Sequence, residues 1–96
     1  MKVTIGIPAF NEEKNIAKII SQIKEITPSI IVCDDYSTDN TNKIANSLGV
    51  DVITHSKNMG YGSSIKSIFT IAKEIDSDVL VTMDADGQHR IEDLKK

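Results

Sequence analysis

The sequence has little cysteine, no tryptophan and no long apolar run, and these shortages exclude several classes of structure. Its 96 residues include one cysteine, Cys33. A single thiol excludes an internal disulfide and a zinc site built from cysteines, and it is typical of a reducing compartment. The longest purely apolar run covers residues 30–33, far short of the roughly 20 residues that span a bilayer. We therefore expect a cytoplasmic chain with no membrane segment of its own, or one held at the cytoplasmic face of a membrane by a longer parent protein.

Basic residues are too few and too scattered for a nucleic-acid-binding surface. The chain has 11 lysines and arginines against 14 aspartates and glutamates, which gives a net charge of −3. A protein that binds nucleic acid by neutralising phosphates needs a basic face, and the sequence contains no cluster of lysine and arginine. The remaining composition, 40% hydrophobic and 26% charged, is that of an ordinary globular protein with one small domain.

Hydrophobic patterning predicts strands and helices that alternate from the first residue. Short β-rich runs predict strands over residues 3–7, 29–33, 50–54 and 79–83. Pro8 is expected to end the first strand. Isoleucines at helical spacing then predict a helix with Asn11 as its N-cap and Ile26 on its buried stripe. A second helix ends at Gly49, and a third follows the loop over residues 58–62.

This alternation predicts an α/β fold, a Rossmann-like parallel sheet with helices on both faces. A fourth helix is expected to begin at Ile91, and the chain ends inside it, directly after the richest polar motif. We interpret residues 1–96 as the N-terminal portion of a larger domain. The alternative is a complete small domain whose last residues fray.

The most informative motif follows the predicted fourth strand, at the edge of the sheet where open parallel sheets bind ligands. Asp84 and Asp86 are two residues apart. In extended backbone such residues point the same way, so two carboxylates face one point, and Gln88 can add an amide oxygen. Oxygen ligands of this kind suit Mg²⁺ or Mn²⁺. The alternative is a turn in which an aspartate caps the next helix.

Two further strand ends carry polar residues. Asp34 and Asp35 follow the second strand. A carboxylate there can accept an N–H group from a uracil or guanine ring or hold a ribose hydroxyl, and a helix-entry turn is the alternative. Asn58, Gly60 and Gly62 follow the third strand, and they fit either a phosphate-holding helix N-terminus or a simple loop.

The histidines and the cysteine carry less information. His55 is interpreted as a surface residue at a strand end and His89 as a helix-entry residue, and neither is assigned as a base. Cys33 is interpreted as a small buried hydrophobic residue.

Taken together, four polar segments resemble one known family. They are Pro8-Ala9-Phe10-Asn11-Glu12-Glu13, Cys33-Asp34-Asp35-Tyr36-Ser37-Thr38-Asp39, Asn58-x-Gly60-x-Gly62 and Met83-Asp84-Ala85-Asp86-Gly87-Gln88-His89. Their order and spacing are similar to those of family 2 glycosyltransferases, and most of all to the dolichyl- or polyprenyl-phosphate sugar transferases. Each segment alone is loose, whereas four in sequence are specific.

The resemblance implies the nucleotide-sugar-binding portion of a GT-A fold. It implies that the nucleoside is held by Pro8, Phe10, Glu12, Cys33 and Asp35. It also implies that the divalent ion and the diphosphate are bound by Asp84, Asp86 and Gln88, with Ala85 beside them. The two aspartates of this set then carry the catalytic role.

The expected function is metal-dependent, inverting transfer of a sugar from a UDP- or GDP-linked donor to a polyprenyl phosphate or a saccharide. Asp84 and Asp86 hold the Mg²⁺ or Mn²⁺ ion, which neutralises the charge that grows on the leaving group. A lipid phosphate is already anionic and needs no general base. We expect this chain alone to bind the donor with little or no turnover.

Alternatives come from other classes of protein. A non-catalytic nucleotide-binding or assembly module would form a homodimer through an open sheet edge. A receiver-like signalling domain also has an acidic cluster, but its acid pair follows the first strand, where this chain has Pro8. A sugar nucleotidyltransferase has a glycine-rich loop at that place, and residues 8–11 contain no glycine.

Overall fold

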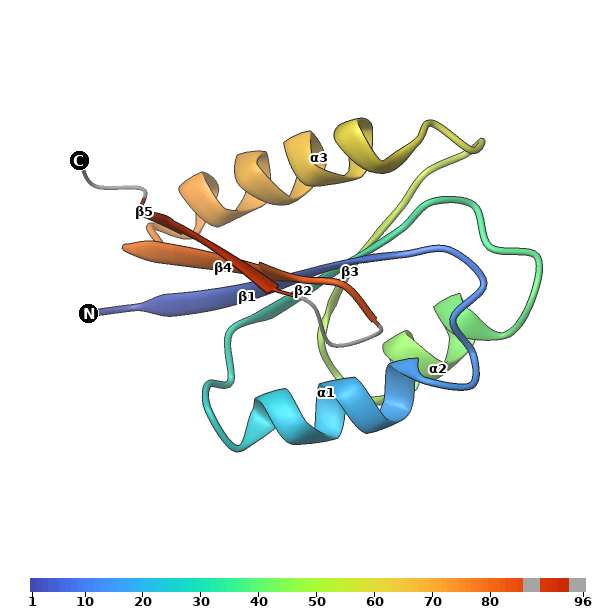
Figure 1. Ribbon diagram of the computed structural model, residues 1–96, viewed down its shortest axis with the longest axis horizontal. Helices are drawn as coiled ribbons and strands as arrows, with labels where there is room; N and C mark the ends of the chain where they lie inside the picture. The colour runs from blue at the N-terminus through green and yellow to red at the C-terminus, as the bar shows by residue number, and fades with distance from the viewer. Residues whose placement is uncertain (86–88, 94–96) are drawn as a thin grey trace.

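The computed structural model describes residues 1–85 and 89–93, which form one sheet with helices packed against it (Figure 1). The strands are β1 (Val3–Ala9), β2 (Ile30–Asp34), β3 (Asp51–Thr54), β4 (Val79–Met83) and β5 (His89–Asp93). The helices are α1 (Ile16–Lys24), α2 (Thr41–Ser47) and α3 (Tyr61–Glu74). Within these described residues, no helix is both long enough and apolar enough to cross a membrane.

Four parallel strands confirm the predicted Rossmann-like α/β sheet. The strand order is β3-β2-β1-β4-β5, with β1 parallel to both β2 and β4 and with β2 parallel to β3. Helices α1 and α2 lie on one face of the sheet and α3 on the other (Figure 1). The chain moves outward from β1 to β3 and then returns to the other side of β1, so the strand order reverses between β1 and β4. Ligands of such sheets bind beyond the strand ends at this reversal.

Strand β2 is buried on both faces, as its lack of polar alternation predicts. Ile30 and Val32 pack in the core beneath α1 and α2, whereas Ile31 and Cys33 pack with Ile68 of α3. Helix α1 adds four buried isoleucines to the first of these clusters. Each buried isoleucine contributes about 1.5–3 kcal/mol to stability, so the two clusters hold the helices on opposite faces.

Two predictions about the first helix are wrong. Ile26 is 70% exposed, because α1 ends at Lys24 and the buried stripe ends with it. Asn11 is not the N-cap: the cap residue is Asn15, and Asn11 has a left-handed φ of 53°. The Asn11 side chain instead accepts the backbone N–H of Thr38 at 2.8 Å, which ties the loop after β1 to the loop after β2.

The predicted fourth helix is also wrong for residues 91–93. These residues belong to β5, which pairs antiparallel with β4 so that Ile91 lies opposite Val81. The outer edge of β4 would otherwise present a row of unpaired backbone N–H and C=O groups, and pairing with β5 satisfies them. The outer strands of the described sheet are therefore β3 and β5. The homodimer through an open sheet edge stays a prediction.

Gly6 of β1 allows α3 to pack closely on the sheet. A Cβ atom at this position would overlap the side chain of Ile68, which is fully buried. We expect Gly6→Ala to lower the free energy of unfolding by about 1–3 kcal/mol, measured by urea denaturation. The control is Gly62→Ala in the first turn of α3, where a Cβ meets nothing within 4 Å and alanine favours the helix. Equal losses in both variants would contradict the packing argument.

Candidate functional site

Pro8 lies where β1 and β4 stop pairing. Strand β1 continues past Pro8 to Ala9, so the prediction that Pro8 ends the strand is wrong. Pro8 still lies opposite Cys33 of β2, but the pairing of β1 with β4 ends two residues earlier, at Gly6. Because Pro8 has no N–H to donate, its place beyond the last β1–β4 pair costs the sheet no hydrogen bond.

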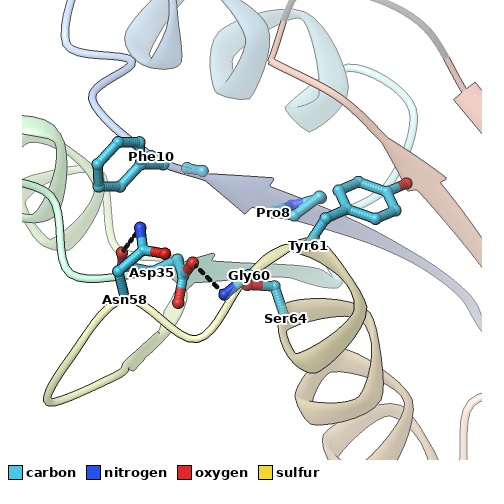
Figure 2. Close-up of a pocket in the computed structure, with 8 residues that line it drawn as sticks. Pro8, Phe10, Asp35, Asn58, Gly60, Tyr61 and Ser64 are labelled. Atoms are coloured by element: carbon cyan, nitrogen blue, oxygen red, sulfur yellow. Dashed lines mark hydrogen bonds between the residues drawn. The ribbon is translucent and has the colours of Figure 1, made fainter.

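Two adjoining pockets lie at this edge of the sheet. The first, here called the Asp35 pocket, has a volume of about 280 Å³ and is lined by Pro8, Ala9, Phe10, Asp35, Asn58, Gly60, Tyr61 and Ser64 (Figure 2). The second, here called the Asp84 pocket, is lined by Pro8, Phe10, Glu12, Tyr61, Asp84 and Ala85. Pro8, Phe10 and Tyr61 line both. The pair of pockets therefore extends from the end of β2 to the end of β4, across the reversal of strand order.

Most of the residues predicted to bind substrate line these pockets. They are Pro8, Phe10, Glu12, Asp35, Asp84 and Ala85. Cys33 lines neither pocket; it is fully buried, with its Sγ 3.5 Å from Nε2 of His55. Asp86 and Gln88 lie outside the described residues.

The carboxylate of Asp35 fixes the loop that precedes α3. Its Oδ1 accepts the N–H of Met59 at 2.8 Å, and its Oδ2 accepts the N–H of Gly60 at 2.9 Å. Gly60 has a φ of 93°, a conformation that favours glycine, and it leads the chain directly into α3. Figure 2 shows the Asp35 carboxylate turned toward Gly60. Asp35 is thus both a wall of the pocket and the anchor of that loop.

His55 is buried behind Asp35, so its interpretation as a surface residue is wrong. Its Nδ1 lies 2.8 Å from Oδ1 of Asp35, and its Nε2 lies 3.0 Å from Oγ of Ser67. An ionised carboxylate can only accept hydrogen bonds, so Nδ1 carries a hydrogen and donates a hydrogen bond to Oδ1 of Asp35. The predicted strand order contains a signal for this pair. Asp35 and His55 each follow a strand of one parallel sheet, and the ends of neighbouring parallel strands meet at one edge.

Hydrogen bonds decide the charge state of Asp35. Burial raises the pKa of this carboxyl, but the hydrogen bonds from His55, Met59 and Gly60 outweigh burial and hold the pKa below its ordinary value. The group is therefore ionised at neutral pH, as acceptance of three N–H groups requires.

The neighbouring Asp34 has a structural role. Its Oδ1 accepts the N–H of Ser37 at 3.1 Å, and the Ser37 hydroxyl in turn accepts the N–H of Asn11 at 2.9 Å. This is the helix-entry turn that the sequence left open as an alternative for the acid pair. Asp34 is buried and lines neither pocket, so Asp35 alone of the two faces the site.

Glu12 and Asp84 bring two carboxylates to the Asp84 pocket. One oxygen of Glu12, Oε2, is buried and has no hydrogen-bond partner among the described residues, although a buried charged oxygen is costly without one. A divalent cation or a ligand hydroxyl would supply that partner, and oxygen donors of this kind fit Mg²⁺ or Mn²⁺. Among the described residues, no group of three or more His, Cys, Asp or Glu side chains could hold a metal ion.

Sequence patterns did not indicate Tyr61 or Ser64 as site residues. Tyr61 is half-exposed and lies beside Pro8 (Figure 2). Ser64 is fully buried, and its hydroxyl has no hydrogen-bond partner among the described residues. Both belong to the first turn of α3, which confirms that the segment with Asn58, Gly60 and Gly62 opens a helix. The position of α3 could have indicated both residues, because this helix begins just before the chain returns across β1.

Comparison with known families decides the classification of this chain. Residues 4–96 match the family described as Glycosyl transferase family 2. The chain belongs to glycosyltransferase family 2. This membership confirms the resemblance found in the four polar segments, and it leaves no support for the receiver-like alternative.

Relatives within glycosyltransferase family 2 match over nearly the whole chain. The chain is 35% identical to the UDP-N-acetylglucosamine–dolichyl-phosphate N-acetylglucosaminyltransferase of Methanococcus voltae, with 94% of the chain and 43% of the relative covered. It is 38% identical to the dolichol-phosphate mannosyltransferase of Pyrococcus furiosus, with 100% and 29% covered. The chain therefore spans less than half the length of these curated relatives.

Solved structures share the fold of this family 2 chain. The glucosyl-3-phosphoglycerate synthase of Mycobacterium tuberculosis, solved with Mn²⁺, UDP and glucosyl-3-phosphoglycerate, aligns with a TM-score of 0.70 at 24% identity over 88% of this chain and 33% of that one. A second mycobacterial protein aligns with a TM-score of 0.75 at 24% identity, over 88% and 31%. At this identity the likeness shows the fold, which is of the GT-A type.

The lowered pKa of Asp35 predicts a loss of stability in acid. Because the folded-state pKa lies below the ordinary value of 3.8, the stabilisation by ionised Asp35 is complete above pH 3.8 and is lost as the pH falls through the folded-state value. We expect Asp35→Asn to lower the free energy of unfolding by about 1–3 kcal/mol at pH 6, and by less at pH 3. Urea denaturation at the two pH values measures the difference.

Asp51→Asn, on the exposed start of β3, is the matched control and should change stability little at either pH. A loss in Asp35→Asn that is the same at pH 6 and pH 3 would contradict the account of the Asp35 hydrogen bonds.

Proposed function

We propose that residues 1–96 form the nucleotide-sugar-binding portion of a GT-A domain that transfers a sugar with inversion. The Asp35 pocket holds the nucleoside of the donor, and the Asp84 pocket holds its diphosphate together with a divalent ion. The proposal is supported above all by Glu12 and Asp84, which reach one pocket from the ends of β1 and β4. That pocket adjoins the Asp35 pocket at the reversal of strand order, so one extended ligand can occupy both.

The nucleoside part of the proposal is supported by the lining of the Asp35 pocket. Phe10 is 45% exposed and Tyr61 is 47% exposed, and their rings lie on either side of Pro8 (Figure 2). Exposed rings beside a pocket offer stacking surfaces to a base, worth about 1–3 kcal/mol. Asp35 adds an acceptor for a base N–H, and from the adjoining Asp84 pocket the unpaired oxygen of Glu12 adds an acceptor for a ribose hydroxyl. Each of these contacts orients the donor without taking part in the chemical step.

The diphosphate part of the proposal assigns Asp84, Asp86 and Gln88 to Mg²⁺ or Mn²⁺. Magnesium usually takes one or two protein carboxylates and fills its shell with water and phosphate oxygens, so this small donor set is sufficient. The bound ion supplies positive charge that stabilises the nucleoside diphosphate as it leaves. Asp84 and Glu12 would fix the position of that charge relative to the nucleoside.

A phosphate group is the acceptor that the described residues suit best. His55 is the one described histidine side chain, and its two ring nitrogens are occupied by Asp35 and Ser67, so it does not offer a base to either pocket. A lipid phosphate needs none, because it is already anionic, and two relatives are named for transfer to dolichyl or dolichol phosphate.

The single cysteine, which is free and buried, accords with the proposed cytoplasmic location.

Metal-dependent binding of a nucleotide tests the proposal directly. We expect calorimetric titration with UDP and GDP to give binding with at least one of them when Mn²⁺ is present, and binding at least about tenfold weaker without the ion. Asp84→Asn and Asp86→Asn should each abolish the metal-dependent part, whereas Asp51→Asn on the outer strand β3 should retain it. A folded chain that binds neither nucleotide in Mn²⁺ would contradict the proposal.

Stacking on Phe10 gives a second, metal-independent test. Phe10→Leu should weaken nucleotide binding by about 5–150-fold, the range that corresponds to loss of one stacked base. Phe10→Tyr keeps the ring and should bind normally. Tyr36→Leu is the control, since Tyr36 is a similarly exposed ring that lines neither pocket. Equal affinities of Phe10→Leu and the unsubstituted chain would exclude Phe10 from the base site.

A further inference from the structure

Most of the hydrogen-bonding capacity of Asp35 is used by the protein itself. An ionised carboxylate offers about four acceptor positions, two on each oxygen. Oδ1 accepts from Nδ1 of His55 at 2.8 Å and from the N–H of Met59 at 2.8 Å, while Oδ2 accepts from the N–H of Gly60 at 2.9 Å. Oδ1 is therefore saturated, and one position remains on Oδ2.

The remaining position is available to a ligand only from the Asp35 pocket. The Asp35 side chain is 7% exposed, and it lines that pocket beside Gly60 (Figure 2). The other contacts of the carboxylate are fixed, because two of its donors are backbone groups and the third belongs to a buried ring. A ligand at this site therefore meets one free acceptor on one oxygen.

The common bases of sugar nucleotides differ in how many donors they present to a carboxylate. Guanine presents two neighbouring donors, the ring N1–H and the exocyclic amino group, which together occupy both oxygens of one carboxylate. Uracil presents a single donor, N3–H, between two carbonyl oxygens. One free position on Oδ2 matches uracil, whereas guanine would leave a donor unpaired against a saturated Oδ1, and a buried donor without a partner is costly.

We propose that His55 is a specificity-determining residue that makes this site select uracil over guanine nucleotides. His55 acts through Asp35, whose Oδ1 it fills, and is thus a positioning residue that does not touch the ligand. The inference rests on the proposed function, because it assumes that the Asp35 pocket holds the base of a nucleotide donor.

Contacts on the far side of the imidazole keep His55 in this role. With Nδ1 donating to Asp35, the other ring nitrogen, Nε2, lies 3.0 Å from the Ser67 hydroxyl of α3. The thiol of Cys33 lies 3.5 Å from the same nitrogen. The ring is therefore held between β2 and α3, and the N–H at Nδ1 has no direction available other than toward Asp35.

Two amide substitutions separate the two ring nitrogens. In His55→Asn the amide nitrogen takes the place of Nδ1 and keeps the contact with Asp35. In His55→Gln it takes the place of Nε2, so the contact with Ser67 stays and Oδ1 of Asp35 gains a free position. Ser67→Ala is the control that removes the Nε2 partner alone. Thermal unfolding of each variant confirms that it is folded before binding is measured.

The experiment measures the affinities of the chain for UDP and GDP in Mn²⁺ by calorimetry. We expect UDP to bind at least about tenfold more tightly, as the loss of one buried hydrogen bond requires. This ratio should persist in His55→Asn and Ser67→Ala, and it should fall to about threefold or less in His55→Gln, with GDP binding gained.

The possible outcomes distinguish this inference from the proposed function. Binding of GDP as tight as that of UDP by the unsubstituted chain would overturn the selection of uracil and leave the proposed function in place. An unchanged ratio in His55→Gln would overturn the role of His55. Failure to bind either nucleotide would contradict the proposed function itself.

Discussion

The hydrogen bonds to Asp35 are the interaction on which the rest of the site depends. They join the end of β2, the residue after β3 and the loop before α3 through one buried carboxylate. Without that carboxylate, the backbone N–H groups of Met59 and Gly60 and the ring N–H of buried His55 would lose their acceptor, and the loop that leads into α3 would lose its anchor at the end of β2. Tyr61 and Ser64 belong to that turn, so the shape of the Asp35 pocket follows from the same contact. The electrostatics agree, since the N–H donors also keep the carboxyl ionised.

Topology explains why a second pocket lies beside the first. The chain returns across β1 to form β4, and the two strands stop pairing at Gly6, before Pro8. The segments that follow them then bring Glu12 and Asp84 to one pocket. A ligand with a flat base at one end and a charged diphosphate at the other meets an acceptor and exposed rings first, and a pair of carboxylates suited to a cation second. This arrangement of the two pockets agrees with membership of glycosyltransferase family 2.

The sequence predicted the periodic features well and the contacts between distant segments poorly. Isoleucine spacing and uninterrupted β-rich runs specified the four parallel strands and three helices, because burial on one or two faces leaves a direct pattern. The polar strand ends pointed to Phe10, Asp35 and Asp84 for the same topological reason. The Asp35–His55 pair was missed because the strand order places both residues at one edge of the sheet without specifying which side chains meet there, and hydrophobic periodicity records no contact between residues 20 positions apart. Strand β5 was missed because it pairs with the outer edge of β4, and the residues after His89 do not by themselves indicate that this edge is open.

Paramagnetic broadening by Mn²⁺ in NMR spectra tests the central claim, that the two pockets form one donor site. With UDP present, the amide signals of Glu12 and Ala85 should broaden first, while those of Met59 and Gly60 should shift on addition of the nucleotide. Broadening confined to acidic residues elsewhere, such as Asp51 on β3, with no shift at Gly60, would contradict the account.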